Sequence, residues 1–174
     1  MINVTALKKA MKQQAKQTIW WQVDKSEGDR HVIGGRHMMV ILDDHELTGP
    51  IISALADVGL IKPNMALTGG REIELPTAVR QLVQQVANTS SALTAVDTKL
   101  DYLWAAKTPT RILAVPGKEW VFVNRMYFDI FPASTDWRCQ GGGGLVYIRD
   151  RAIIAPISVQ PEVEVFTYLK EMKR

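Results

Sequence analysis

Apolar residues recur at helical spacing near the start of the chain, within residues 3–17. Val4, Leu7 and Met11 fall on one face of this segment. Asn3 suits the N-cap, because its side chain can accept a hydrogen bond from a free backbone N–H of the first turn. Lysines at four-residue spacing occupy another face. The pattern predicts a helix with one buried face and one cationic face.

After this segment, the pattern changes to short apolar runs separated by turn residues. TIWWQV (18–23) predicts a strand, and RHVIGGRHMMVIL (30–42) predicts either one bent strand or two. IISALADVG (51–59) predicts a short helix. The glycine pair at 69–70 is typical of a two-residue hairpin turn, since such turns need positive φ angles.

The region from Thr77 to Ala106 has apolar residues at alternating spacings of three and four. Two structures fit this spacing. One is a pair of amphipathic helices, broken near residues 88–91 and each packed on a sheet. The other is one long helix that joins the two halves or pairs with a second subunit. The positions are Val79, Leu82, Val86, Thr89, Leu93, Val96, Leu100 and Leu103.

The remaining residues predict strands followed by a helix. TRILAV (110–115) and EWVFVNRMYFDIF (119–131) are two strands linked by a Pro-Gly turn. LVYIRD (145–150) and AIIAPISV (152–159) are two more, and Pro161 begins the last helix. We therefore expect an α+β fold in which hairpin-linked strands form antiparallel sheets with helices on one face.

The two halves also share a pattern, which predicts an internal duplication of a helix-strand-strand unit. Residues 31–42 align with residues 120–131, and each stretch follows a helix and a strand. We expect a first α/β repeat over 1–76, a helical connector over 77–107 and a second repeat over 108–174, forming one compact unit. The aligned identities are Val32 with Val121, Arg36 with Arg125, and Ile41 with Ile130.

Composition narrows the class of protein. The 174 residues are 47% hydrophobic and 22% charged, which predicts a folded chain with a real core. The longest apolar runs are too short for a bilayer, and the N-terminal lysines are not followed by the apolar core of a signal peptide. A single cysteine allows no intramolecular disulfide. We expect a cytoplasmic protein without a membrane partner.

Candidate catalytic and metal-binding residues are few. Asp43 to Glu46, with His37 upstream, could bind a divalent metal, but they also fit a solvated turn, which we favour because the spacing matches no metal motif. Cys139 fits a free cysteine at a loop edge better than a nucleophile. Residues 141–144 are four glycines without P-loop spacing. We predict no catalytic residue, metal or cofactor, and do not favour an enzyme.

The lysine face of the first helix is the best candidate for binding a partner. Lys8, Lys12 and Lys16 lie at four-residue spacing, where each pair of like charges destabilises the helix by roughly a few tenths of a kcal/mol. Phosphates facing this stripe would turn the repulsion into binding. The alternative is an ordinary solvated face. Arg36 adds a cation that has a counterpart, Arg125, in the second half.

A basic helix followed by hairpin-linked strands, repeated within one chain, resembles the DNA sliding clamp family. GGRHMMVI (34–41) and LVYIRDRAIIAPISV (145–159) resemble strands of bacterial clamp domains. The resemblance implies duplicated units whose helices line a positive hole and whose sheets form the outside. It implies that Lys8, Lys12, Lys16 and Arg36 lie nearest the phosphates of DNA.

Two functions follow as hypotheses. The first is a non-enzymatic, clamp-like accessory protein of replication or of a mobile element, which binds duplex DNA as a homo-oligomer. The second is a self-associating assembly module, of phage origin, that uses the 79–103 seam or a sheet edge and binds no nucleic acid. An enzyme would need a pocket that contains His37, Asp43 or Cys139.

Overall fold

The computed structural model describes most of the chain. The described residues are 2–25, 28–76, 81, 84, 92–103, 109–117, 120–132, 136–140, 144–148 and 151–157. The predicted helix beginning at Pro161, the proposed break at 88–91 and most of the glycine run at 141–144 lie outside them.

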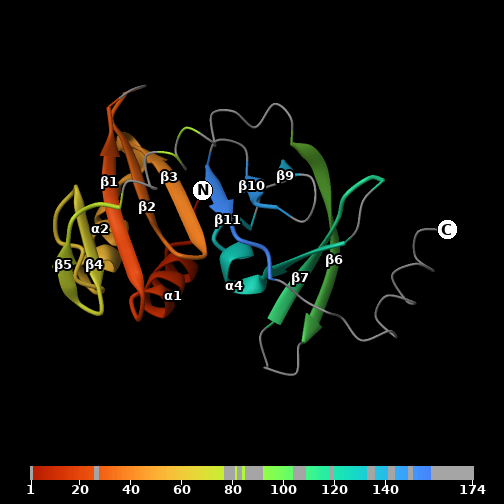
Figure 1. Cartoon of the computed structure of the whole chain (residues 1–174), viewed down its shortest axis with the longest axis horizontal. Coiled ribbons are helices and arrows are strands. Elements are labelled where there is room, and N and C mark those ends of the chain that lie inside the picture. Colours follow the sequence, from red (N-terminus) through yellow and green to blue (C-terminus); the bar gives the residue numbers. More distant parts are fainter. Residues whose placement is uncertain are drawn as a thin grey trace.

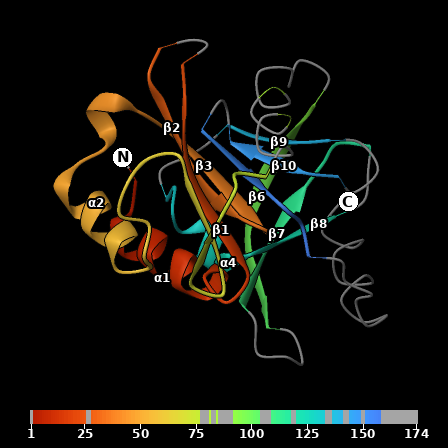
Figure 2. The ribbon, with the colours of Figure 1, turned by 60° about the vertical axis from the view of Figure 1, so that its left-hand side comes forward.

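The described strands form a single antiparallel sheet in the order β5-β4-β1-β2-β3-β11-β10-β9-β6-β7-β8 (Figures 1 and 2). This confirms the α+β class. The strands are β1 Thr18–Asp24, β2 Arg30–Gly35, β3 Met38–Asp43, β4 Met65–Thr68, β5 Arg71–Ile73, β6 Leu93–Leu103, β7 Pro109–Ala114, β8 Val121–Asn124, β9 Trp137–Cys139, β10 Val146–Ile148 and β11 Ala152–Ile154.

Helices α1, α2 and α4 pack on one face of this sheet, as predicted. Leu7 of α1, Ile51 of α2 and Tyr127 of α4 are buried in one core cluster with Ile19 and Trp21 of β1. None of the helices in the described part of the chain has both the length and the apolar character needed to cross a lipid bilayer. The helices are α1 Val4–Gln14, α2 Gly49–Ala56 and α4 Arg125–Phe128, with a 3-10 turn η1 at Asp44–Glu46.

The opposite face of the sheet carries a second apolar cluster. Successive side chains of a strand point to opposite faces, so Trp20 lies in this second cluster although both of its neighbours lie in the first. Val32, Met39 and Ile41 are buried beside it. The central strands therefore read as almost continuous apolar runs, which is typical of strands covered on both faces.

One strand near the end of the described chain joins the two halves of the sheet. Strand β11 pairs with β3 through Ala152 opposite Val40, Ile153 opposite Met39 and Ile154 opposite Met38. Further backbone bonds flank this pairing, from Ile41 N to Arg151 O at 2.7 Å and from Ala155 N to His37 O at 2.9 Å. The strands of both halves therefore belong to one continuous hydrogen-bonded sheet.

Several local predictions are confirmed. Asn3 caps α1, where its side chain accepts a bond from the Ala6 N–H at 3.1 Å. Residues 30–43 form two strands rather than one. The β4–β5 hairpin turns at Gly69 and Gly70, whose φ angles are 55° and 78°.

The helix predicted from Thr77 to Ala106 is wrong over residues 93–103, which form strand β6. The apolar spacing resembles that of a helix, but the apolar residues of this segment lie on both faces of a strand. Leu93 is opposite Cys139, which belongs to the core under the helices, whereas Leu100 packs in a cluster with Ile112 and Phe122 on the other side.

The long strand predicted over 119–131 is also wrong beyond Asn124. Strand β8 ends there because the Asn124 side chain accepts a hydrogen bond from the Met126 N–H at 3.0 Å and caps the short helix α4. The segment aligned with β3 is therefore helical, and the internal duplication is not shown by this topology. The boundaries proposed for the repeats stay a prediction.

Strands β2 and β3 approach so closely at Gly34 that a side chain there would collide with the backbone. A Cβ atom there would lie 2.7 Å from the backbone oxygen of Met38 and 3.0 Å from the Cα of Met39. Because backbone atoms cannot move aside, we expect Gly34→Ala to lower the free energy of unfolding by about 1–3 kcal/mol. Urea unfolding measures this loss.

The matched control is Gly49→Ala, where a Cβ would meet nothing within 4 Å. It should change the free energy of unfolding by less than about 0.5 kcal/mol. Equal stability of the two variants would contradict the close packing described here.

Candidate nucleic-acid interface

Helix α1 lies between α2 and α4 with its apolar side inward. Its buried residues include Leu7, Met11 and Gln14. The amide oxygen of Gln14 accepts a hydrogen bond from the His37 N–H at 2.9 Å, which ties the C-terminal end of α1 to the β2–β3 turn. Exposed Arg36 lies in the same turn. The structure thus brings Arg36 to the end of the lysine-bearing helix.

The three predicted lysines differ in their surroundings. Lys8 forms an ion pair with Asp57 just after α2, and both side chains are about two-fifths exposed. The hydrogen bond and the charge of Lys8, with a further contribution from the charge of Lys12, lower the pKa of Asp57. Asp57 therefore stays ionised and offsets the charge of Lys8.

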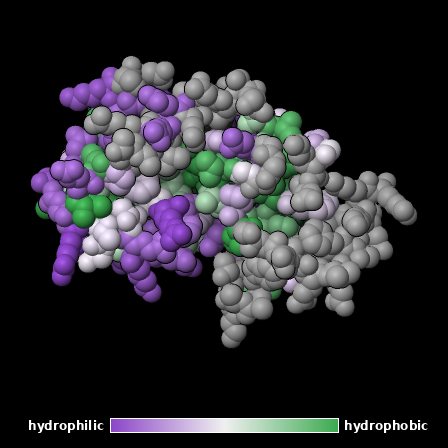
Figure 3. All heavy atoms as spheres, viewed as in Figure 1, coloured by the Kyte–Doolittle hydropathy of each residue, from purple (hydrophilic) through white to green (hydrophobic). Residues whose placement is uncertain are grey.

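Lys12 and Lys16 are exposed, and the described residues include no carboxylate in ion-pair contact with either one. Lys12 lies in the last turn of α1, and Lys16 follows the helix directly. With Arg36 they form an exposed basic surface at one end of the helix layer. We call Lys12, Lys16 and Arg36 the basic surface. Figure 3 shows many hydrophilic residues on its left-hand side, where α1, α2 and strands β1 to β5 lie in Figure 1.

Sequence reasoning did not place a second group of polar residues, which lines a pocket between α1 and α4. The pocket has a volume of about 300 Å³. The alignment of Arg125 with Arg36 was the only feature of the sequence that singled out a residue of this group, and it did not connect Arg125 with Lys9. The lining residues are Lys9, Gln13, Pro109, Asn124, Arg125, Met126 and Asp129.

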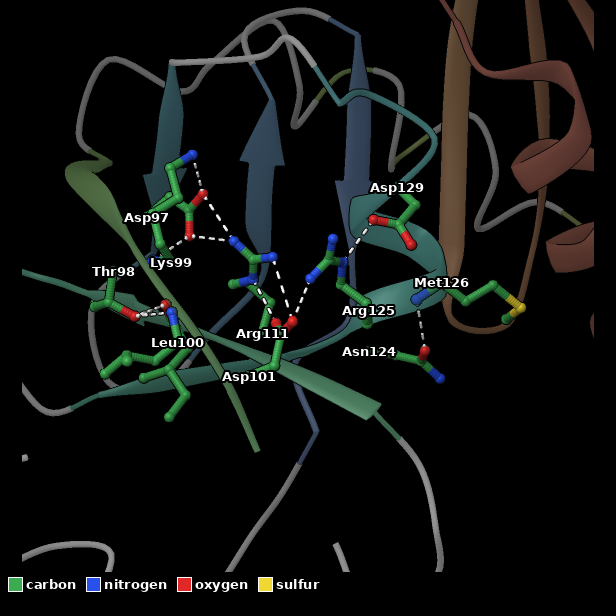
Figure 4. A network of polar contacts seen from close by, with 11 residues as sticks. Asp97, Thr98, Lys99, Leu100, Asp101, Arg111, Asn124, Arg125, Met126 and Asp129 are labelled. Atoms are coloured by element: carbon green, nitrogen blue, oxygen red, sulfur yellow. Dashed lines mark hydrogen bonds and ion pairs between the residues drawn. The ribbon is translucent and has the colours of Figure 1, made fainter. Parts of the chain in front are cut away.

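A buried ionic network holds one wall of this pocket (Figure 4). Arg111 of β7 is only 6% exposed. Its Nη1 lies 3.1 Å from both carboxylate oxygens of Asp97, and its Nε donates to Asp101 at 2.6 Å. A buried guanidinium is tolerated when carboxylates neutralise it and accept its N–H groups.

An irregularity in β6 allows both carboxylates to reach the same cation. The pairing with β7 shifts between Asp97 and Asp101, and Lys99 adopts a left-handed φ of 63°. The Asp97 side chain accepts the Lys99 N–H at 3.0 Å, and Thr98 Oγ1 donates to Ile112 O at 2.8 Å. These local bonds take up polar groups that a regular ladder would have paired.

Burial alone would raise the pKa of Asp97. Hydrogen bonds from the Lys99 side chain and backbone and from Arg111 outweigh that effect, so the pKa is lowered. Arg111 is also covered by an aromatic ring, because its Cζ lies 4.9 Å from the centroid of Phe128. Phe128 in turn stacks on Trp137, with centroids 4.1 Å apart and planes 5° from parallel. The network therefore fixes α4 against the sheet.

Arg125 extends the network to the pocket. Its Nε donates to Asp129 Oδ1 at 2.6 Å, and its Nη1 donates to Asp101. The hydrogen bond to Asp129 is the largest effect on the Arg125 pKa and raises it, together with the charges of both carboxylates, against the effect of burial. Arg125 is thus a permanently charged side chain held in one orientation.

The cluster predicted as a possible metal site is divided among structural roles. Glu46 accepts the Asp43 N–H at 3.1 Å and pairs with Arg151. Asp44 lies 3.1 Å from Nε2 of His31. His37 precedes β3 whereas Asp43 ends it, so the strand separates them. Within the described ranges, no three His, Cys, Asp or Glu side chains come together as a metal ion would require.

His31 and Cys139 are both buried. The Trp21 indole N–H donates to Nδ1 of His31 at 3.1 Å, so Nε2 carries the proton of the neutral ring and donates to Asp44. Cys139 is 2% exposed and is the last residue of β9, at the edge of the loop that follows, and its thiol donates to Gln140 O at 3.4 Å.

No protein-family model matches this chain, and neither the curated proteins nor the solved structures include a significant match.

The buried network predicts a large difference between two arginines. Arg111→Met removes the buried cation between Asp97 and Asp101 and leaves them only Lys99 and Arg125 as partners, so we expect the free energy of unfolding to fall by about 2–4 kcal/mol. Thermal or urea unfolding at neutral pH measures the change.

Arg138→Met is the matched control. Arg138 pairs with Asp136 at 3.2 Å, but both side chains are about one-third exposed. Its loss should be below about 1 kcal/mol, as for other solvent-screened pairs. Similar losses for the two variants would show that Arg111 has no special role.

Proposed function

We propose that this protein is a non-enzymatic, clamp-like accessory protein that binds duplex DNA through the exposed face of α1, in replication or in a mobile element. The observation that carries the proposal is the basic surface. Lys12 lies in the last turn of α1, which has no acidic residue, and Lys16 follows the helix; the only described ion pair on the helix takes up Lys8. This role implies a cytoplasmic location.

Basic side chains without carboxylate partners suit a phosphate backbone. Each phosphate neutralised by a lysine or arginine releases condensed counterions, which makes binding salt-dependent and independent of base sequence. The net charge of +3 is small, so the local surface rather than the whole chain must supply the attraction.

The layering of the fold supports the clamp-like mode. Helices α1, α2 and α4 share one face of the sheet, so a duplex on that side would meet helices while the sheet faces away (Figure 1). Encircling a duplex would require several copies of the chain. The proposal therefore includes a homo-oligomer.

The direct test is DNA binding by the double variant Lys12→Gln/Lys16→Gln. Removing two phosphate contacts should reduce the slope of log affinity against log salt by about 1.8, from about 0.9 per contact. Fluorescence anisotropy with two unrelated duplexes at several salt concentrations measures both the slope and the lack of sequence preference.

Lys62→Gln is the control, since Lys62 is exposed but pairs with Glu72 of β5 at 3.5 Å, away from α1. Lys8→Gln should reduce affinity less than Lys12→Gln, because Asp57 already offsets its charge. Failure of the unaltered protein to bind any duplex at low salt would exclude the proposed function.

A second candidate function, self-association without nucleic acid, is favoured by apolar exposure on β6. Val96 is 57% exposed and Leu103 is 64% exposed, and both lie on β6. Exposed apolar side chains on a strand favour pairing with another protein surface.

If β6 mediates self-association, Val96→Lys should lower the average mass seen by light scattering at high concentration. Ile61→Lys, at a residue outside the sheet that is 71% exposed, is the control. A monomer at every concentration would exclude this candidate and would also leave the clamp-like proposal without its oligomer.

A further inference from the structure

We propose that the pocket between α1 and α4 binds a phosphate group, with Lys9 and Arg125 as its cationic ligands. The pocket is separate from the basic surface, since none of Lys12, Lys16 and Arg36 lines it. The phosphate belongs either to a nucleic-acid backbone or to a free phosphorylated compound. Only the first source rests on the function proposed above.

The lining offers more hydrogen-bond donors than acceptors. Arg125 uses Nε and Nη1 on carboxylates, and Asn124 uses its amide oxygen on the Met126 N–H. The bonds found among the described residues leave the Nη2 group of Arg125 and the amide NH₂ of Asn124 without an acceptor. Lys9 adds an ammonium group with three donors. Donors of this kind suit the several oxygens of a phosphate.

The balance of charge also favours an anion. Lys9 and Arg125 are the cations of the lining, and Asp129 is its single carboxylate. Asp129 and Asp101 already neutralise much of the Arg125 charge, so the surplus comes from Lys9. Lys9 should therefore determine affinity, while Arg125 supplies a fixed direction for hydrogen bonding.

The pocket is largely formed before any ligand arrives. Two carboxylates hold Arg125, and a backbone bond from Asn3 N to Ile130 O at 2.9 Å joins the start of α1 to the residues after α4. A ligand would need to immobilise only the Lys9 and Gln13 side chains, which lowers the entropic cost of binding.

The size and the apolar part of the pocket fit a phosphate that carries an organic group. Its volume of about 300 Å³ is at the lower end for small-molecule sites. Pro109 and Met126 provide an apolar wall beside the polar groups. A phosphate linked to a sugar would contact both parts.

The test is a titration of the whole ¹⁵N-labelled protein with inorganic phosphate, and separately with adenosine monophosphate, at low salt. We expect amide shifts centred on Lys9, Gln13, Arg125 and Met126. Lys9→Gln should weaken binding at least about tenfold, as for loss of a charge-assisted contact. Gln13→Glu, which adds a negative charge to the lining, should weaken it as well.

Lys62→Gln is the control, because Lys62 is an exposed lysine that neither lines the pocket nor belongs to the basic surface. It should leave phosphate binding unchanged. Equal effects of Lys9→Gln and Lys62→Gln, shifts spread evenly along α1, or no binding of either ligand would overturn the proposal.

Short duplex DNA distinguishes the two sources of the phosphate. If the phosphate comes from DNA, Lys9→Gln weakens duplex binding and phosphate binding together. If it comes from a free compound, only phosphate binding weakens. A protein that binds phosphate in this pocket but no duplex would support the pocket while excluding the DNA-binding function, so the two failures are separable.

Discussion

The arrangement of β6, β7 and α4 depends on neutralising one buried cation. Two carboxylates neutralise Arg111, and a regular β6 strand would bring only one of them within hydrogen-bonding distance of the guanidinium. The irregular stretch of β6 between Asp97 and Asp101 brings both within reach. The ring of Phe128 covers the remaining face of the guanidinium. The same bonds that satisfy the charge therefore place α4, and through α4 they place the wall of the pocket beside α1.

This network also explains why charge is distributed unevenly around α1. On the α4 side, Asp101 and Asp129 bind Arg125, so much of the positive charge there is already compensated. On the α2 side, Asp57 compensates Lys8. Among the described residues around α1, the cations without such partners are Lys9, which faces the pocket beside α4, and Lys12, Lys16 and Arg36, which lie toward the end of the helix. Electrostatic attraction at this surface is therefore local, which is consistent with the small net charge of the chain.

Sequence patterns predicted the first half of the fold better than the second. The cap at Asn3, the strand at TIWWQV and the turn at Gly69 and Gly70 depend on interactions between near neighbours, which local patterns report. Strand β6 was missed because its irregularity shifts the alternation of faces, and the resulting spacing imitates a helix. The helical turn after Asn124 was missed because one side-chain cap outweighed a run of strand-forming residues.

The candidate site was predictable only in part, for a related reason. The lysine stripe of α1 is a local pattern and could be seen in the sequence. The ion pair between Lys8 and Asp57 could not, nor could the meeting of Lys9 with Arg125 across two helices. These contacts join residues far apart in the chain, and nothing in their spacing reports the distance between them in space.

The pairing of β3 with β11 has a consequence for the newly made chain. During synthesis, β3 emerges from the ribosome long before Ala152–Ile154, the strand that covers its edge. Until then, the apolar residues of β3 present unpaired backbone groups, which are a template for association with another chain. Contacts of such long sequence separation also slow folding. The nascent protein is therefore most vulnerable to aggregation after β3 has been synthesised and before β11 has, and binding of a chaperone in that interval would cover the open edge of β3.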